Sequence, residues 1–200
     1  GDYDGDGKAD EAVYRSGAWS IKRSSDGGNT VIAHGGPTWS AVPADYDGDG
    51  KTDVAVYMNG AWSIKRSSDN VTTVMGHGGP LWQPVPGDYD GDGKADVAVY
   101  RPSNGVWFIV RSSNSTVQTT EWGGGTSVPV AADYDGDGKT DVAVYQSGLW
   151  YIVGSTSGVR VAEWGEGNSI PEPGDYDGDG KADVAVYEPD NGLWFIFGST

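Results

Sequence analysis

A nine-residue segment occurs five times in this chain of 200 residues and is almost invariant. It reads Asp-Tyr-Asp-Gly-Asp-Gly-Lys, then Ala or Thr, then Asp, and its copies begin at Asp2, Asp45, Asp88, Asp133 and Asp175. The offsets between copies are 43, 43, 45 and 42 residues. Repeats of about 40–45 residues are typical of four-stranded propeller blades. The chain is therefore expected to fold as one structural unit repeated five times.

Each copy has carboxylates at positions 1, 3, 5 and 9 and glycines at positions 4 and 6. Alternate residues of a tight loop can point to one centre, so these carboxylates can surround a hard divalent cation. The position-6 glycine permits the sharp turn, and the carbonyl of the position-7 lysine would add an oxygen while its ammonium points to solvent. The predicted ligands are Asp2, Asp4, Asp6, Lys8, Asp10, Asp45, Asp47, Asp49, Lys51, Asp53, Asp88, Asp90, Asp92, Lys94, Asp96, Asp133, Asp135, Asp137, Lys139, Asp141, Asp175, Asp177, Asp179, Lys181 and Asp183.

Calcium is the metal that this composition favours, with up to five ions per chain. The chain has no cysteine and two histidines, which disfavours metals that prefer sulfur or imidazole ligands. Magnesium prefers a smaller octahedral shell and retains water. The alternative is an Asp/Gly-rich turn without metal, in which four carboxylates within nine residues would repel one another. Val-Ala-Val-Tyr follows most copies, which predicts a strand and argues against a helical EF-hand.

The acidity of the chain is mainly metal-binding capacity. The formal charge is −16, and the five loops hold twenty of the 29 acidic residues. Five divalent ions would bring the formal charge to about −6. This acidic balance argues against a nucleic-acid partner. No apolar run reaches the roughly 18 residues that a membrane-spanning helix needs, so no membrane span is expected.

Between the loops the pattern predicts short strands and no helix. In the third repeat, β-branched and aromatic runs occur at residues 97–100, 106–111, 117–122 and 128–132. We therefore predict a single all-β domain, a β-propeller of five four-stranded repeats. The repeats span approximately residues 1–43, 44–86, 87–131, 132–173 and 174–200.

The first and last repeats are expected to be incomplete. The chain starts at a calcium loop, so the first repeat lacks its innermost strand, and the fifth lacks its outermost strand, which leaves 18 strands. Closure of the ring is expected from further sequence, from another chain or from an imperfect last blade. Five blades is the favoured count, and an arc of a larger ring is the alternative.

A tryptophan and an isoleucine alternate on one strand face of every repeat, which predicts a core between blades. These residues are Trp19, Trp62, Trp107, Trp150 and Trp194, with Ile21, Ile64, Ile109, Ile152 and Ile196. Glu11 occupies the place that Val takes in the other four repeats, which predicts an unburied edge on the first repeat.

The first two repeats share turns that run from His34 to Trp39 and from His77 to Trp82. At the histidine position the third and fourth repeats have Trp. One interpretation is that His and Trp exchange packing roles within a structural turn, and this is favoured. The other is a sugar site, in which Trp stacks on a pyranose and His binds its hydroxyls.

The same two repeats carry four basic residues, Lys22, Arg23, Lys65 and Arg66. Together with His34, Trp39, His77 and Trp82 they form a candidate surface for an acidic glycan or an acidic protein patch. The alternative is a solvated edge on which Lys and Arg extend their charged ends into water, and this is somewhat favoured.

The repeated Asp-Tyr-Asp-Gly-Asp-Gly-Lys-x-Asp-Val-Ala-Val-Tyr, followed by Gly-x-Trp-x-Ile, resembles the FG-GAP/VCBS repeats of integrin-α-like β-propellers. The resemblance covers essentially the whole chain. It implies calcium loops between the first and second strands, with the ligand positions named above. It also implies adhesion or ligand binding, in some members as a lectin and in others as a scaffold within an enzyme.

The function expected from these features is a calcium-stabilised, non-catalytic binding or adhesion module, extracellular and either secreted or at the cell surface. Its partner would be an extracellular protein or glycan. The alternatives are a propeller lectin that uses the His/Trp turns and a scaffold domain of a secreted polysaccharide-degrading enzyme. Most carboxylates belong to the metal loops, and Glu121 and Glu163 are expected on a solvated strand face. No catalytic Ser/His/Asp or Cys/His arrangement is recognisable, so catalysis is not expected.

Overall fold

The computed structural model describes residues 1–200, which form 18 β-strands in five antiparallel sheets and no helix. The strands are β1 (Glu11–Arg15), β2 (Ala18–Lys22), β3 (Asn29–Ala33), β4 (Ser40–Ala41), β5 (Val54–Met58), β6 (Ala61–Lys65), β7 (Thr72–Gly76), β8 (Gln83–Pro84), β9 (Val97–Arg101), β10 (Val106–Val110), β11 (Val117–Glu121), β12 (Val128–Pro129), β13 (Val142–Gln146), β14 (Leu149–Gly154), β15 (Gly158–Glu163), β16 (Ile170–Pro171), β17 (Val184–Glu188) and β18 (Leu193–Phe197).

Each sheet is one blade, and neighbouring strands in a blade are consecutive in the chain. Blades 2, 3 and 4 have four strands each, in the orders β4-β5-β6-β7, β8-β9-β10-β11 and β12-β13-β14-β15. Blade 1 consists of β1-β2-β3 and blade 5 of β16-β17-β18. The predicted total of 18 strands is confirmed, as are the missing innermost strand of blade 1 and the missing outermost strand of blade 5.

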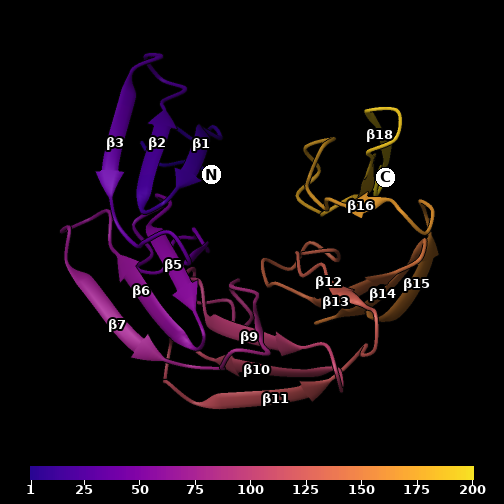
Figure 1. Ribbon diagram of the computed structural model, residues 1–200. Coiled ribbons are helices and arrows are strands. Elements are labelled where there is room, and N and C mark those ends of the chain that lie inside the picture. Colours follow the sequence, from indigo (N-terminus) through magenta and orange to yellow (C-terminus); the bar gives the residue numbers. More distant parts are fainter.

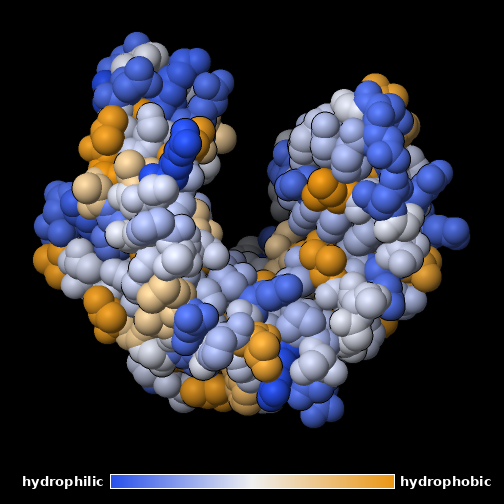
Figure 2. All heavy atoms as spheres, in the orientation of Figure 1, coloured by the Kyte–Doolittle hydropathy of each residue, from blue (hydrophilic) through white to orange (hydrophobic).

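The five blades form a β-propeller that is open between blades 1 and 5. Figure 1 shows the blades side by side around one axis, with β7, β11 and β15 on the outer side. Figure 2 shows open space between the two end blades. The predicted all-β propeller with five blades is therefore confirmed, and its ends do not meet.

The hairpin between the second and third strand positions of a blade is set by residues that tolerate positive φ. In blade 2, Asn59 (φ 50°) and Gly60 (φ 92°) connect β5 to β6. Ser16 and Gly17 do the same in blade 1, and Ser147 and Gly148 in blade 4. Two central residues with positive φ define the turn whose twist matches antiparallel strands.

The core lies between blades rather than within them. Trp62 and Ile64 of β6 pack with Val97 and Val99 of β9 in the next blade. The same packing recurs at the other three interfaces. Trp19, Trp62, Trp107 and Trp150 are each at most 2% exposed. This confirms that these four tryptophans are core residues.

The end blades show what happens without a neighbour. Trp194 and Ile196 of β18 are 53% and 45% exposed, because no blade follows blade 5. The prediction that all five tryptophans are core is therefore wrong for the last one. On blade 1, Glu11 is 79% exposed and pairs with Lys22 at 3.3 Å. This confirms the predicted unburied edge of the first repeat.

The interblade core makes a direct prediction about stability. Trp107→Ala removes a fully buried indole between blades 3 and 4 and should lower the free energy of unfolding by about 3–5 kcal/mol. Trp194→Ala is the matched control, because the same strand position is half exposed in blade 5, and it should cost much less. Urea denaturation of the two variants measures the difference. Equal losses would contradict the interblade account of the core.

Candidate functional site

The five acidic loops occupy the predicted place in each blade. In blade 2 the loop leaves β4 and enters β5, and an antiparallel bridge between Ala44 and Asp53 closes its base. Equivalent bridges close the loops of blades 3, 4 and 5. In blade 1 the Asp10 N–H donates to the Gly1 carbonyl at 2.7 Å, so all five loops lie at the same end of their blades.

The position-1 aspartate shapes the loop from inside. Asp45 accepts hydrogen bonds from the backbone N–H groups of Gly48 at 2.6 Å and Gly50 at 2.8 Å. Both glycines have positive φ, 79° and 82°, which residues with a Cβ rarely adopt. The same pair of hydrogen bonds recurs in the other four loops. The Gly-x-Gly spacing thus lets the backbone fold around one carboxylate.

The position-9 aspartate joins the loop to the next turn of the same blade. Asp53 is fully buried, and its Oδ2 accepts from Tyr46 N at 2.9 Å while its Oδ1 accepts from Ser67 N at 2.6 Å. Ser67 follows β6, so the carboxylate holds the turn after β6 against the loop before β5. Every blade has this clamp.

Each loop gathers three carboxylates. In the loops of blades 2 to 5, oxygens of the aspartates at positions 1, 3 and 9 lie within 4.8 Å of one another, as in Asp88, Asp90 and Asp96. In blade 1 the grouped aspartates are Asp2, Asp4 and Asp6. The predicted position-5 ligand therefore lies outside the cluster in four loops. In blade 2 this residue, Asp49, accepts instead from the Ser67 hydroxyl at 2.9 Å.

Two clusters contain a carboxylate oxygen that fits a cation. Asp90 Oδ1 and Asp135 Oδ1 are buried and have no hydrogen-bond partner. A buried, unpartnered carboxylate oxygen is costly unless a positive charge lies beside it. Several oxygens around a small centre are the donor set that hard divalent cations prefer. The residues present therefore fit a calcium-type ion.

Burial also acts on the ionisation of the clamp aspartates. It raises the pKa of the Asp53, Asp96 and Asp141 carboxyls above their ordinary value. The Asp10 pKa is lowered, mainly by the Ser24 backbone N–H, in the one loop that no blade precedes. A divalent cation beside these carboxylates would favour their charged form.

Sequence reasoning missed a set of serines and threonines that line the loops. In blade 2 the Ser68 hydroxyl donates to Asp47 at 2.5 Å and the Ser67 hydroxyl to Asp49. The signal was present, because Arg-Ser-Ser follows the tryptophan strand in three repeats and Gly-Ser-Thr in two. The loop-lining residues are Ser24, Ser25, Ser67, Ser68, Ser112, Ser113, Ser155, Thr156, Ser199 and Thr200.

Neighbouring loops also contact one another. Thr52 N in the second loop donates to the Asp2 carbonyl of the first at 2.6 Å. The Lys51 stem lies over Gly5, where an added Cβ would be 2.8 Å from Lys51 Cε. Equivalent contacts link the loops of blades 2 to 5. In blades 2 to 5 the stem of the position-7 lysine therefore packs on the preceding loop.

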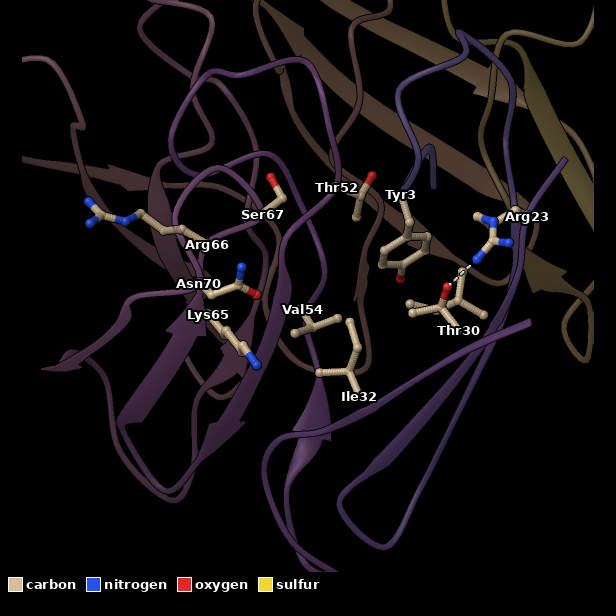
Figure 3. Close-up of a pocket in the computed structure, with 11 residues that line it drawn as sticks. Tyr3, Arg23, Thr30, Ile32, Thr52, Val54, Lys65, Arg66, Ser67 and Asn70 are labelled. Carbon is tan, nitrogen blue, oxygen red and sulfur yellow. Dashed lines mark hydrogen bonds between the residues drawn. The ribbon is translucent and has the colours of Figure 1, made fainter. Parts of the chain in front are cut away.

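Three of the four predicted basic residues line a groove between blades 1 and 2, shown in Figure 3. The groove has a volume of about 160 Å³, and Arg23, Lys65 and Arg66 contribute to its walls. Arg23 pairs with Asp26 at 2.8 Å, and Arg66 pairs with Asp69 at 2.6 Å. The fourth, Lys22, pairs with Glu11 on the free face of blade 1.

The two histidines occupy the place of a tryptophan in later blades. His34 Nε2 lies 2.9 Å from the Ser63 carbonyl of the next blade, and His77 Nε2 lies 3.1 Å from the Phe108 carbonyl. In blade 3 the indole N–H of Trp122 makes the equivalent hydrogen bond to the Tyr151 carbonyl at 2.9 Å. Each of these rings therefore bonds one blade to the next.

The structure does not bring the histidine turns and the basic residues together. In blade 1, Lys22 pairs with Asn29 and Ala18 with Ala33, so Arg23 and His34 lie at opposite ends of the antiparallel strands. Strands of five residues separate these ends by about 13 Å. The single surface predicted from the sequence is therefore two separate regions.

Trp39 and Trp82 are partly buried and pack against the interblade core. The Trp82 ring lies 5.1 Å from that of Phe108, and the Arg101 guanidinium lies 5.6 Å from the Trp82 ring. Glu121 and Glu163 are exposed at the ends of β11 and β15, as expected. No helix in the structure has the length and apolar character needed to cross a membrane.

Comparison with known protein families identifies the family to which the repeats belong. The family model described as FG-GAP-like repeat matches residues 2–56 and 88–144, which is more than half of the chain. This chain belongs to the FG-GAP-like repeat family. The resemblance read from the loop motif is thereby confirmed. No curated protein matches the sequence.

Among solved structures, the chain is similar to an Agrocybe aegerita lectin described as specifically recognising non-reducing terminal N-acetylglucosamine. The TM-score is 0.61 at 17% sequence identity, and the match covers 98% of this chain. The chain spans 63% of the lectin chain, which is less than two thirds. At this identity the similarity concerns the fold.

A single loop can be tested by counting ions. Asp90→Ala removes the buried, unpartnered oxygen of the third cluster and should reduce the number of bound divalent ions by one in native mass spectrometry with calcium. The other loops should keep their ions, because repeats couple mainly to nearest neighbours. Glu121→Ala is the control, since it removes an exposed carboxylate outside the clusters. Simultaneous loss of all ions would contradict independent sites.

Proposed function

We propose that this FG-GAP propeller is a calcium-stabilised, extracellular, non-catalytic binding module whose ligand is a glycan. The observation that carries the calcium part is the repeated cluster with a buried, unpartnered carboxylate oxygen, seen at Asp90 and Asp135. A bound calcium ion would neutralise these carboxylates and hold each loop at the base of its blade. The ion would therefore support the fold rather than react.

An extracellular location fits the ion chemistry. Loops of this carboxylate-rich type can fill at the millimolar calcium of extracellular fluid. FG-GAP repeats are typical of extracellular proteins, which supports a secreted or cell-surface module. The expected ligand class follows the lectin of similar fold, which makes a glycan a better first candidate than a protein.

A binding role also fits the remaining polar groups. The loop carboxylates accept several hydrogen bonds each from their own blade, so they are committed to structure. Glu121 and Glu163 stand exposed on the outer strands of different blades. Two carboxylates that serve as acid and base must flank one substrate bond, which these two do not. Glu121 and Glu163 therefore give no support to the enzyme-scaffold alternative.

Removing calcium tests the structural role. Without the ion, three clustered carboxylates remain in each of five loops, and their repulsion should lower the melting temperature markedly. Mass action gives about 2.7 kcal/mol for one ion at a hundredfold excess over its Kd. Circular dichroism melts with calcium and with EDTA measure the effect. An unchanged midpoint of thermal unfolding would contradict the calcium proposal.

Glycan binding is tested separately. Wild-type protein with calcium should bind glycans with terminal N-acetylglucosamine on a printed array, and EDTA should abolish the signal by loosening the frame. A protein partner is the competing outcome, detected as adhesion to cells whose surface glycans have been removed enzymatically. Adhesion without any array signal would overturn the glycan proposal.

A further inference from the structure

We propose that two pockets between blades, at the end opposite the acidic loops, each bind one neutral pyranose ring. This inference rests on the proposed glycan-binding function and names its sites. The 3/4 pocket lies between blades 3 and 4 and has a volume of about 240 Å³, and the 4/5 pocket lies between blades 4 and 5 and has about 330 Å³. Their principal lining residues are Trp122, Ser127, Gln146 and Tyr151 for the first and Trp164, Glu188, Asn191 and Phe195 for the second.

The turns at all four blade interfaces share one backbone hydrogen bond. The turn follows the outermost strand of blades 1 to 4, which is β3, β7, β11 or β15. A backbone hydrogen bond closes it, and the donor is Trp39 N, Trp82 N, Ser127 N or Ser169 N. The acceptors are the carbonyls of Gly36, Gly79, Gly124 and Glu166, at 3.1–3.2 Å. The residue that donates this hydrogen bond is therefore a tryptophan at two interfaces and a serine at the other two.

The tryptophan fills the space that the serine leaves open. Trp82 packs against Phe108 of the next blade, with ring centroids 5.1 Å apart and the ring planes tilted by 43°. Its indole also lies against the turn backbone, since an added Cβ on Gly79 would be 3.5 Å from Trp82 Cδ1. Tyr151 and Phe195 hold the strand position of Phe108 in blades 4 and 5, and there they line pockets. A flat ring thus fits this position, because the chain itself places one there twice.

A sugar ring matches what the two pockets offer. Tyr151 and Phe195 present aromatic surface of the kind that packs on the apolar face of a pyranose, and Trp122 and Trp164 add further apolar wall. Hydroxyl partners stand at the rim. Gln146 donates from Nε2 to Thr126 at 3.0 Å, which leaves its Oε1 as an acceptor.

The 4/5 pocket carries the stronger polar group. Glu188 accepts from the Ser169 hydroxyl through Oε1, which leaves Oε2 for a ligand hydroxyl. Asn191 adds an amide to the same wall. Glu166 is a second carboxylate in this lining, and neither pocket is lined by Lys or Arg. Carboxylates without a cation repel an acidic sugar, so the 4/5 pocket selects neutral rings, and the uncharged 3/4 pocket offers no cation to an acidic one.

The proposal is tested by filling the pockets with tryptophan, the residue that occupies this turn position in blades 1 and 2. The double variant Ser127→Trp with Ser169→Trp copies the Trp39 and Trp82 arrangement and should weaken binding to the neutral glycans of a printed array at least tenfold. Its calcium count should be unchanged. Thr119→Trp is the matched control, since it adds an indole on the exposed face of β11 away from both pockets, and it should bind like the wild type.

A second variant covers the case in which the inserted indoles disturb the fold. Gln146→Ala with Glu188→Ala keeps the pockets open but removes the rim groups, and it should also weaken binding at least tenfold. If the wild type binds glycans and either double variant, correctly folded, binds them equally well, the pocket proposal is wrong although glycan binding itself stands. Wild-type preference for sulfated over neutral glycans would overturn the selectivity. Absence of any wild-type glycan signal would overturn the proposed function itself.

Discussion

A buried aspartate that accepts two backbone N–H groups is the interaction on which each blade depends. Asp53 receives one hydrogen bond from the start of its own loop and another from the turn that follows β6. Both oxygens are thereby satisfied, which permits the full burial of this carboxylate. The clamp fixes the loop at one end of the blade, and the remaining carboxylates gather around it.

Blades are then joined by a short set of contacts repeated along the arc. The tryptophan face of one blade packs on the valine face of the next, and a ring N–H or histidine nitrogen bonds across the outer turn. Loop-to-loop hydrogen bonds such as Thr52 to Asp2 join the acidic end. Since each blade uses one face for each neighbour, the last blade displays Trp194 and the first displays Glu11.

The repeat spacing predicted the blades, the strand count and the place of the loops, because every local signal recurs at a fixed offset. The sequence also predicted that His34 and Arg23 share one surface, and the repeat spacing could not test that prediction. These residues are close in sequence, yet an antiparallel strand carries the chain back across the blade between them. The position-5 aspartates were expected as ligands, but they lie outside the carboxylate clusters of four blades, and in blade 2 this aspartate accepts from the Ser67 hydroxyl. The serine comes from a turn 18 residues further along the chain, so the spacing within the loop motif could not reveal this contact.

The two ends of the propeller are built under different constraints. At the acidic end, five nearly identical loops contact their nearest neighbours through backbone hydrogen bonds and lysine stems. At the opposite end, the same turn tolerates either Trp82 or Ser127 without a change in its backbone hydrogen bond. A rigid frame with variable turns is the arrangement in which binding sites usually arise. The two interfaces with a serine at this turn hold the pockets, whereas Trp39 and Trp82 pack against the core at the other two, and the strand order of the blades stays the same.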